Sequence, residues 1–268
     1  MINLNCMEHY SLDELHLFLK NLRRPIIAIS GGLDSSLLAL LLFEAKGSEM
    51  LSLTALTSSL SSRDRMSVMK FVAQHTIPHT FIETSEFKDE HYLSNDKDRC
   101  YHCKRHLFSA MKKFAEEFSY QEILYGAQKD DLDDYRPGNI AAEEASVIAP
   151  FIIAGWGKSE IRAEARRRGL DIAEKPASPC LASRIEYGIS VSEERLRRIE
   201  KAEELLYAKG LNIFRVRDRG NYATIELGKD EMKINLDREK IIEEIKLLGF
   251  EEVSFDPRGY RQGSLNEF

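Results

Sequence analysis

Several features are scarce in this sequence, and each scarcity narrows what the protein can be. No apolar run approaches the length of a membrane span, and the N-terminus lacks a signal-peptide pattern, so we expect a cytoplasmic protein without a membrane partner. Only four cysteines occur in 268 residues. In a reducing compartment they are expected to be ligands, catalysts or inert thiols rather than disulfides. No internal repeat or low-complexity tract is present.

Positive charge is also in deficit. The chain has 38 lysines and arginines against 44 acidic residues, a net charge of −6. This balance argues against a large nucleic-acid surface, so no nucleic-acid partner is expected. The apolar content of 43% is sufficient for one large core or two modest ones.

The most informative stretch is Ser-Gly-Gly-Leu-Asp-Ser at residues 30–35. It follows a short β-branched apolar run and precedes an apolar helical pattern, which predicts a buried strand, a tight turn and a helix N-terminus. Gly31 and Gly32 provide positive φ and allow a ligand to approach the backbone. The N–H groups of the turn and the helix dipole then favour an anion such as pyrophosphate.

The side chains of this stretch extend the same interpretation. Ser30 and Ser35 offer hydroxyl donors, and Asp34 either caps the helix or reaches a Mg²⁺ ion. No Gly-Lys-Ser/Thr follows, so the stretch is not a Walker A loop. An ordinary glycine-rich turn is the plain alternative for a lone Gly-Gly. The full string instead resembles the PP-loop of ATP pyrophosphatases, which cleave ATP between the α- and β-phosphates.

The first part of the chain alternates between strands and helices, which predicts an α/β fold with a parallel sheet. Ligands of such sheets lie at the carboxyl ends of the strands, where residues 30–35 fall. The serine-rich segment 54–65 and the segment 125–131, which contains Gly126, leave strands at the same edge. Each is either part of the nucleotide or Mg²⁺ site or a plain connector. We expect helices at 11–22, 34–45, 63–75 and 104–118, and strands at 26–29, 50–56, 80–82 and 122–125.

Beyond Pro150 the pattern changes. A basic helix begins at Gly157 and ends near Gly169, and a proline-rich segment follows. A capped helix, two strands, a helix and a strand then form an α-β-β-α-β unit, which we interpret as a smaller ferredoxin-like domain. The predicted domains are residues 1–170 and 171–268. The later elements are expected near residues 193–210, 213–217, 222–227, 241–245 and 252–255.

Three cysteines form a candidate metal site. Cys100 and Cys103 have the C-x-x-C spacing of metal or cluster ligands, a redox pair or a zinc knuckle. Cys180 lies in a segment braced by Pro179, which restricts the backbone in front of it. Buried, inert thiols or a zinc site completed by a histidine are the alternatives. Cys6 lies outside any pattern.

A pair of arginines marks the second domain. Arg215 and Arg217 alternate on a predicted strand and therefore share one face, where two guanidiniums suit a phosphate or carboxylates. A charged, solvated sheet face is the plain alternative. Glu203 and Glu226 lie on neighbouring elements and either pair with these arginines or contribute to a site.

Taken together, these motifs resemble the LarE family of ATP-dependent sulfur transferases, which help to build the nickel-pincer nucleotide cofactor of lactate racemase. The resemblance covers nearly the whole chain. The loop marks only the PP-loop superfamily, and the segments around Cys180 and at the C-terminus are more specific. The motifs that carry it are residues 30–35, 176–184, 214–217, 225–226 and 259–266.

The resemblance implies a reaction and its participants. ATP would adenylate a carboxylate of a pyridinium-3,5-dicarboxylate mononucleotide, releasing pyrophosphate, and sulfur would then displace AMP. In one branch the cysteine matching Cys180 gives up its own sulfur. In another, three cysteines bind a [4Fe-4S] cluster with an extra sulfide, and Cys100, Cys103 and Cys180 place this chain there. The family also implies a homo-oligomer, commonly a hexamer, and the sulfide donor stays unknown.

Roles for individual residues follow from the same resemblance. Asp34 and Cys180 are expected to be catalytic, with Asp34 at the magnesium ion. The three cysteines would be the metal ligands. The nucleotide and substrate would be bound by Ser30, Gly31, Gly32, Asp34, Ser35, Gly126, Ser183, Glu203, Arg215, Arg217 and Glu226.

Three rival functions make different demands on the sequence. A PP-loop tRNA thiolase predicts an RNA-binding appendage and a basic face, and neither is recognisable here. An amidotransferase-like ligase of the same superfamily would need an ammonia source and has no use for three cysteines. A non-catalytic zinc-binding adaptor leaves the loop at residues 30–35 unexplained.

Overall fold

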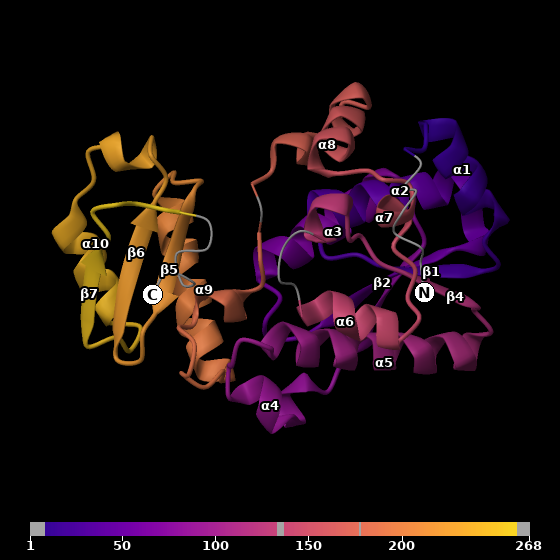
Figure 1. Ribbon diagram of the computed structural model, residues 1–268. Coiled ribbons are helices and arrows are strands. Elements are labelled where there is room, and N and C mark those ends of the chain that lie inside the picture. Colours follow the sequence, from indigo (N-terminus) through magenta and orange to yellow (C-terminus); the bar gives the residue numbers. More distant parts are fainter. Residues whose placement is uncertain (1–8, 133–136, 177, 262–268) are drawn as a thin grey trace. The chain divides into compact units, whose positions relative to one another are not determined.

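The computed structural model describes residues 9–132, 137–176 and 178–261 (Figure 1). The chain divides into two units. The first contains residues 1–86 and 100–178, and the second contains residues 87–99 and 179–268. Within the described ranges, no helix is both long enough and apolar enough to cross a membrane.

The first unit is built on a four-stranded sheet in the order β3-β2-β1-β4, and every neighbouring pair is parallel. The predicted α/β fold with a parallel sheet is therefore confirmed. β1 lies between β2 and β4, so the strand order reverses at β1, and this is the point where open parallel sheets bind ligands. The strands are β1 (Pro25–Ala28), β2 (Leu51–Leu56), β3 (His79–Glu83) and β4 (Glu122–Leu124).

Helices cover both faces of this sheet, because successive strand side chains point to opposite sides. Ile27 of β1 packs into one apolar cluster and its neighbour Ile26 into the other. The first cluster draws on α1 (Leu12–Asn21), α2 (Leu33–Lys46), α3 (Ser62–Gln74), α7 (Pro150–Ile153) and α8 (Lys158–Arg167). The second draws on α5 (Arg99–Phe118) and α6 (Pro137–Glu144).

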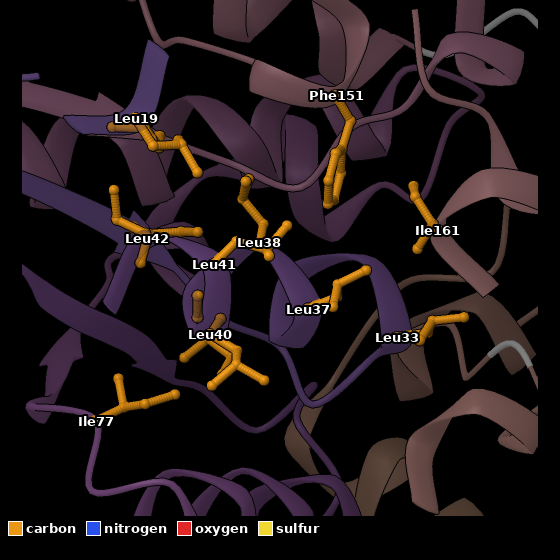
Figure 2. Packing of buried hydrophobic residues seen from close by; sticks show 14 of the residues in the cluster. Leu19, Leu33, Leu37, Leu38, Leu40, Leu41, Leu42, Ile77, Phe151 and Ile161 are labelled. Atoms are coloured by element: carbon orange, nitrogen blue, oxygen red, sulfur yellow. The ribbon is translucent and has the colours of Figure 1, made fainter. Parts of the chain in front are cut away.

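Helix α2 is the central helix of the first cluster. Leu37, Leu38 and Leu41 are fully buried, and Figure 2 shows Leu37 and Leu38 beside Phe151 and Ile161. Full burial of one such side chain contributes about 1.5–3 kcal/mol. This packing fixes the helix axis and therefore fixes its N-terminus at the carboxyl edge of the sheet.

Helix α5 differs from the sequence prediction in where it begins. It starts at Arg99 rather than near residue 104, so Cys100 and Cys103 lie on its first turns instead of in a loop. Apolar periodicity becomes visible only further along, where Phe108 and Met111 enter the core. Three short helices were also not predicted, namely α4 (Glu90–Leu93), α6 and α7.

The second unit contains the predicted order of helix, two strands, helix and strand. Its sheet has the order β5-β6-β7, with β5 and β6 antiparallel and β6 and β7 parallel. Leu196, Ile199, Ala202 and Leu206 form the buried face of the first helix, as the periodicity predicts. The elements are α9 (Glu193–Ala208), β5 (Phe214–Asp218), β6 (Tyr222–Leu227), α10 (Arg238–Lys246) and β7 (Glu252–Phe255).

A piece of chain from the middle of the sequence completes this second unit. Residues 87–99, which include α4, belong to it although both neighbouring segments belong to the first unit. The side-chain amide of Asn95 donates to the carbonyl oxygens of Glu186 and Ile189 at 2.8 and 2.9 Å. The N–H of Val191 donates to the carbonyl of Leu93 at 2.8 Å. These bonds attach the inserted segment to residues 185–191.

Candidate functional site

The turn after β1 leads directly into α2, and no side chain caps the helix end. Gly32 is the N-cap of α2, with extended backbone and no side-chain cap. The capping alternative for Asp34 is therefore wrong, because Asp34 lies one position after the first residue of the helix. The first intrahelical bond of this turn runs from the N–H of Ser36 to the carbonyl of Gly32. The earlier N–H groups of the first turn have no partner within the helix and suit an anion.

Two serines close this turn on itself. The N–H of Ser30 donates to Oγ of Ser35 at 3.2 Å, and the two hydroxyl oxygens lie 3.1 Å apart. The Ser35 hydroxyl also donates to the carbonyl of Gly32 at 3.3 Å. Ser35 is buried whereas Ser30 is exposed. The hydroxyls therefore hold the turn in shape, and their role as ligand donors stays a prediction.

Two glycines allow neighbouring segments to pack against the turn. Gly31 has φ +76°, and a Cβ there would lie 3.0 Å from the carbonyl oxygen of Asp64. At Gly126, directly after β4, a Cβ would lie 2.8 Å from both N and Cα of Ser35. The loops after β1 and β4 therefore meet backbone to backbone at the point where the strand order reverses. Gly126 acts here through its small size.

The carboxylate of Asp34 has a partner that the sequence did not reveal. Nζ of Lys158, the first residue of α8, lies 2.6 and 2.8 Å from its two oxygens. The sequence predicted a basic helix beginning at Gly157, and in the structure Gly157 is the N-cap of α8. Only the order of the strands brings that helix to Asp34, so no local signal identified Lys158.

A second lysine contacts the turn from the segment that precedes Cys180. Nζ of Lys175 donates to the carbonyl of Gly31 at 2.9 Å, to Asp64 at 3.0 Å and to Ser67 at 3.2 Å. Asp64 belongs to the serine-rich segment 54–65. The hydroxyl of Ser61 there accepts from the N–H of Asp64 at 3.0 Å, so the segment caps α3. A nucleotide-binding role for it stays a prediction.

The acidic segment after Gly126 is bonded to the protein. Asp130 accepts a hydrogen bond from the N–H of Lys158 at 2.9 Å. Asp131 is buried and accepts from the backbone N–H and the side-chain amide of Gln128. These carboxylates therefore fix the loop and the start of α8. Residues 133–136 lie outside the described ranges.

The candidate metal ligands are thiols rather than disulfides. Cys100 is exposed and Cys103 half-buried, and their three-residue spacing places them on one face of α5. Cys180, in the second unit, is exposed and precedes a short 3-10 helix at Leu181–Arg184. Within the described residues, no three or more His, Cys, Asp or Glu side chains are grouped to hold a metal ion. The three-cysteine ligand set stays a prediction, and Cys6 lies outside the described residues.

Arg184 holds the turn that carries Cys180. Its buried guanidinium forms two bonds to Glu203, at 3.0 and 3.2 Å. The same guanidinium donates to the carbonyls of Pro179 and Cys180 and, at 3.1 Å, to the hydroxyl of Ser183. Glu203 therefore pairs with Arg184 rather than with the two arginines of β5. Arg184 therefore fixes the backbone on either side of the exposed thiol, and Glu203 holds Arg184 in place.

The two arginines of β5 are both buried in the second unit. Arg217 pairs with Glu226 at 2.9 Å and donates to the carbonyl of Ser183 at 3.1 Å. The plain alternative of a solvated face is therefore wrong. Arg215 lies over the ring of Tyr260, 4.9 Å from its centroid. Burial, followed by repulsion from Arg184, lowers the pKa of the Arg215 guanidinium, so an anion placed beside it would be stabilised.

A cavity of about 290 Å³ opens elsewhere in the first unit, between α3 and the segment 170–175. Lys175 belongs both to its lining and to the contacts of Gly31. Of the segments predicted for the site, only 54–65 reaches it, through Arg63, so we assign the cavity no role. Its lining consists of Arg63, Ser67, Lys70, Phe71, Gln74, His75, Leu170, Asp171, Ile172 and Lys175.

Comparison with known proteins places the chain among relatives of similar length. It is 33% identical to the uncharacterized protein slr1717 of Synechocystis over 258 residues, covering 95% of this chain and 96% of the relative. It is 34% identical to the uncharacterized protein MJ0830 of Methanocaldococcus jannaschii over 241 residues, covering 89% and 91%. The chain belongs to the family of these two proteins.

A third relative carries a functional name. The chain is 28% identical over 254 residues to pyridinium-3,5-bisthiocarboxylic acid mononucleotide synthase of Lactiplantibacillus plantarum, covering 93% of this chain and 91% of that enzyme. No family model matches the chain. This relative is a homologue of the kind that the sequence motifs indicate.

Proposed function

We propose that this protein is an ATP-dependent sulfur transferase that converts a carboxylate of a pyridinium-3,5-dicarboxylate mononucleotide into a thiocarboxylate. The product would serve the nickel-pincer cofactor of lactate racemase. The name of the relative from Lactiplantibacillus plantarum supports this substrate class. We further propose that the protein works in the cytoplasm as a homo-oligomer and that its second unit is a ferredoxin-like domain.

One structural observation carries the proposal. The N-terminus of α2 lies at the reversal point of a parallel sheet and has no side-chain cap, with Gly32 as the N-cap. Its first-turn N–H groups would bind the departing pyrophosphate as a substrate carboxylate attacks the α-phosphorus of ATP. Asp34, on the same turn, would bind the Mg²⁺ that accompanies the phosphates. Adenylation is needed because a carboxylate is a poor electrophile without a leaving group.

The second unit supports a role in holding the anionic substrate. Arg184, Arg215 and Arg217 are buried in this unit, where Arg184 pairs with Glu203 and Arg217 pairs with Glu226. Burial and repulsion from Arg184 lower the pKa of Arg215, and an anion beside its guanidinium would be stabilised. We propose that Arg215 and Arg217 receive the phosphate or a carboxylate of the substrate, close to Ser183 in the same unit.

The sulfur would come through Cys180. Its thiol is exposed while its backbone is held by Arg184, so the turn presents the thiol to solvent from a fixed backbone. The chemistry of three thiols fits iron-sulfur ligation, and a [4Fe-4S] cluster held by Cys100, Cys103 and Cys180 would supply a sulfide at its fourth iron. The alternative is that Cys180 gives up its own sulfur, without a cluster.

The decisive experiment measures iron, zinc and acid-labile sulfide after anaerobic purification. About four irons per chain, with matching sulfide, lost in Cys100→Ser, would support the cluster. About one zinc and no iron would make the cysteines structural. Protein without either metal, even after reconstitution, would favour Cys180 as the donor.

The transfer reaction itself is tested with ATP and the dicarboxylate mononucleotide. We expect release of AMP and pyrophosphate and a product whose mass rises by the replacement of oxygen with sulfur. Cys180→Ser should abolish the product while leaving ATP binding intact. Sulfur transfer by that variant would refute the role of Cys180. Tight tRNA binding with a steep salt dependence would instead revive the tRNA thiolase function.

A further inference from the structure

The carboxylate of Asp34, which the proposed function gives to Mg²⁺, is already engaged by Lys158. Nζ of Lys158 lies within hydrogen-bond distance of both carboxylate oxygens, at 2.6 and 2.8 Å. An ammonium ion and Mg²⁺ both seek these oxygens, and one carboxylate cannot serve both fully. Binding of the metal therefore requires the lysine side chain to move away.

The backbone at Lys158 is fixed, so only its side chain can make that move. Its N–H donates to a carboxylate oxygen of Asp130 at 2.9 Å. A Cβ at Gly157 would lie 2.6 Å from the other oxygen of Asp130, so the backbone passes directly against that carboxylate. The Lys158 side chain itself is 37% exposed. A lysine on a flexible four-carbon stem can therefore swing while the start of α8 stays in place.

Charge balance indicates where the ammonium group goes. Residues 30–36 contain no lysine or arginine and one carboxylate, Asp34. The helix dipole supplies only about half a positive charge, and the dipole together with a Mg²⁺ ion at Asp34 still leaves pyrophosphate incompletely neutralised. A further cation must therefore reach the phosphates from another element. Lysine binds phosphate as a compact point charge.

We propose that Lys158 is a phosphate-binding residue that holds Asp34 while the site is empty and releases it to Mg²⁺ when ATP arrives. The ammonium group then contacts the phosphates that become pyrophosphate. The inference rests on the proposed function. It adds a residue, Lys158, that binds Asp34 before the nucleotide arrives and the phosphates afterwards.

In Lys158→Met we expect two affinities to change in opposite directions, that for Mn²⁺ and that for ATP. Without the lysine, Asp34 loses its competitor, so Mn²⁺ affinity in the absence of nucleotide should rise at least threefold, measured by electron paramagnetic resonance. ATP affinity at saturating Mg²⁺ should fall at least tenfold, measured by calorimetry. Lys158→Arg, which keeps the charge, should retain much of the ATP affinity. If the methionine variant fails to fold, Lys158→Gln provides the test, with the same two expected changes.

Lys209→Met is the matched control, because Lys209 pairs with Glu244 at 2.8 Å with a similar exposed fraction of 28%. Both affinities should match those of the wild type. Unchanged ATP affinity in Lys158→Met, or Mn²⁺ affinity that does not rise, would overturn the proposal and leave a merely structural ion pair. If the wild type binds no ATP, the proposed function fails as well. The two failures are therefore distinguishable.

Discussion

Gly126→Ala would test whether the loop after β4 sets the position of the PP-loop. The added Cβ would lie 2.8 Å from N and Cα of Ser35, whereas ordinary contacts begin at 3.4 Å. Because both atoms are backbone and α2 is packed on all sides, the first turn must shift by about 0.6 Å, the difference between these distances. Such overpacking costs about 1–3 kcal/mol.

The same shift would displace the N–H groups proposed to bind pyrophosphate. A misplacement of 1 Å can cost about a hundredfold in rate, so we expect ATP affinity to fall by about tenfold or more. Calorimetric titration with ATP and Mg²⁺ measures the affinity, and urea denaturation measures the stability. Both should decrease together in Gly126→Ala.

Two other glycines serve as comparisons. Gly138→Ala in α6 places its Cβ 3.1 Å from the flexible side chain of Lys104, so stability and ATP affinity should stay nearly unchanged. At Gly32 a Cβ would meet only Oγ of Ser30, at 3.6 Å. Gly32→Ala should therefore keep the stability but weaken ATP binding, because a ligand must approach that backbone. Gly126→Ala behaving like Gly138→Ala would refute the reasoning.

Three further predictions concern stability. Leu41→Ala removes a fully buried side chain of α2 and should lower the free energy of unfolding by about 2–5 kcal/mol in urea denaturation. Asp218→Ala should cost about 3–5 kcal/mol in the same assay, because the fully buried carboxylate pairs with Arg195 at 2.8 Å and Arg198 at 2.6 Å. If the free energy of unfolding falls by less than about 1 kcal/mol in either variant, the burial or ion-pair argument for that variant is wrong. Burial lowers the pKa of His79 below its ordinary value of 6.5, so the unfolded chain binds the proton more readily. The stability that neutral His79 provides is present above that pH and is lost as the pH falls below it, so melting temperatures at pH 7.5 and 5.5 should differ less in His79→Gln than in the wild type.

Much of the fold could be predicted from the sequence because local signals agreed with tertiary packing. Strands β6 and β7 have the predicted bounds, and the alternation of strands with helices predicted the parallel sheet. The predicted start of α5 was wrong because residues 99–103 show no apolar periodicity of their own. Short helices such as α4 and α7 are held by tertiary contacts and have too few residues for a periodic signal.

The site was predicted less completely, for a physical reason. Residues 30–35 are contiguous, so their chemistry is visible in the sequence. Lys158 is 124 residues away from Asp34, and Glu203 is 19 residues away from Arg184. Such partners are brought together by strand order and helix packing. Gly126 was chosen for its place at a strand end, and its close packing against Ser35 became visible only in three dimensions.

The discontinuous second unit has a consequence for how the chain can be cut and made. A fragment that begins at Pro179 lacks residues 87–99 and therefore loses Asn95, whose amide binds the carbonyls of Glu186 and Ile189. During synthesis, residues 87–99 leave the ribosome long before residues 179–268, so they cannot pack into the second unit until those residues have been made. The two units are thus expected to be inseparable by simple truncation. A chimera that exchanges one unit between relatives would have to exchange both sequence segments of that unit.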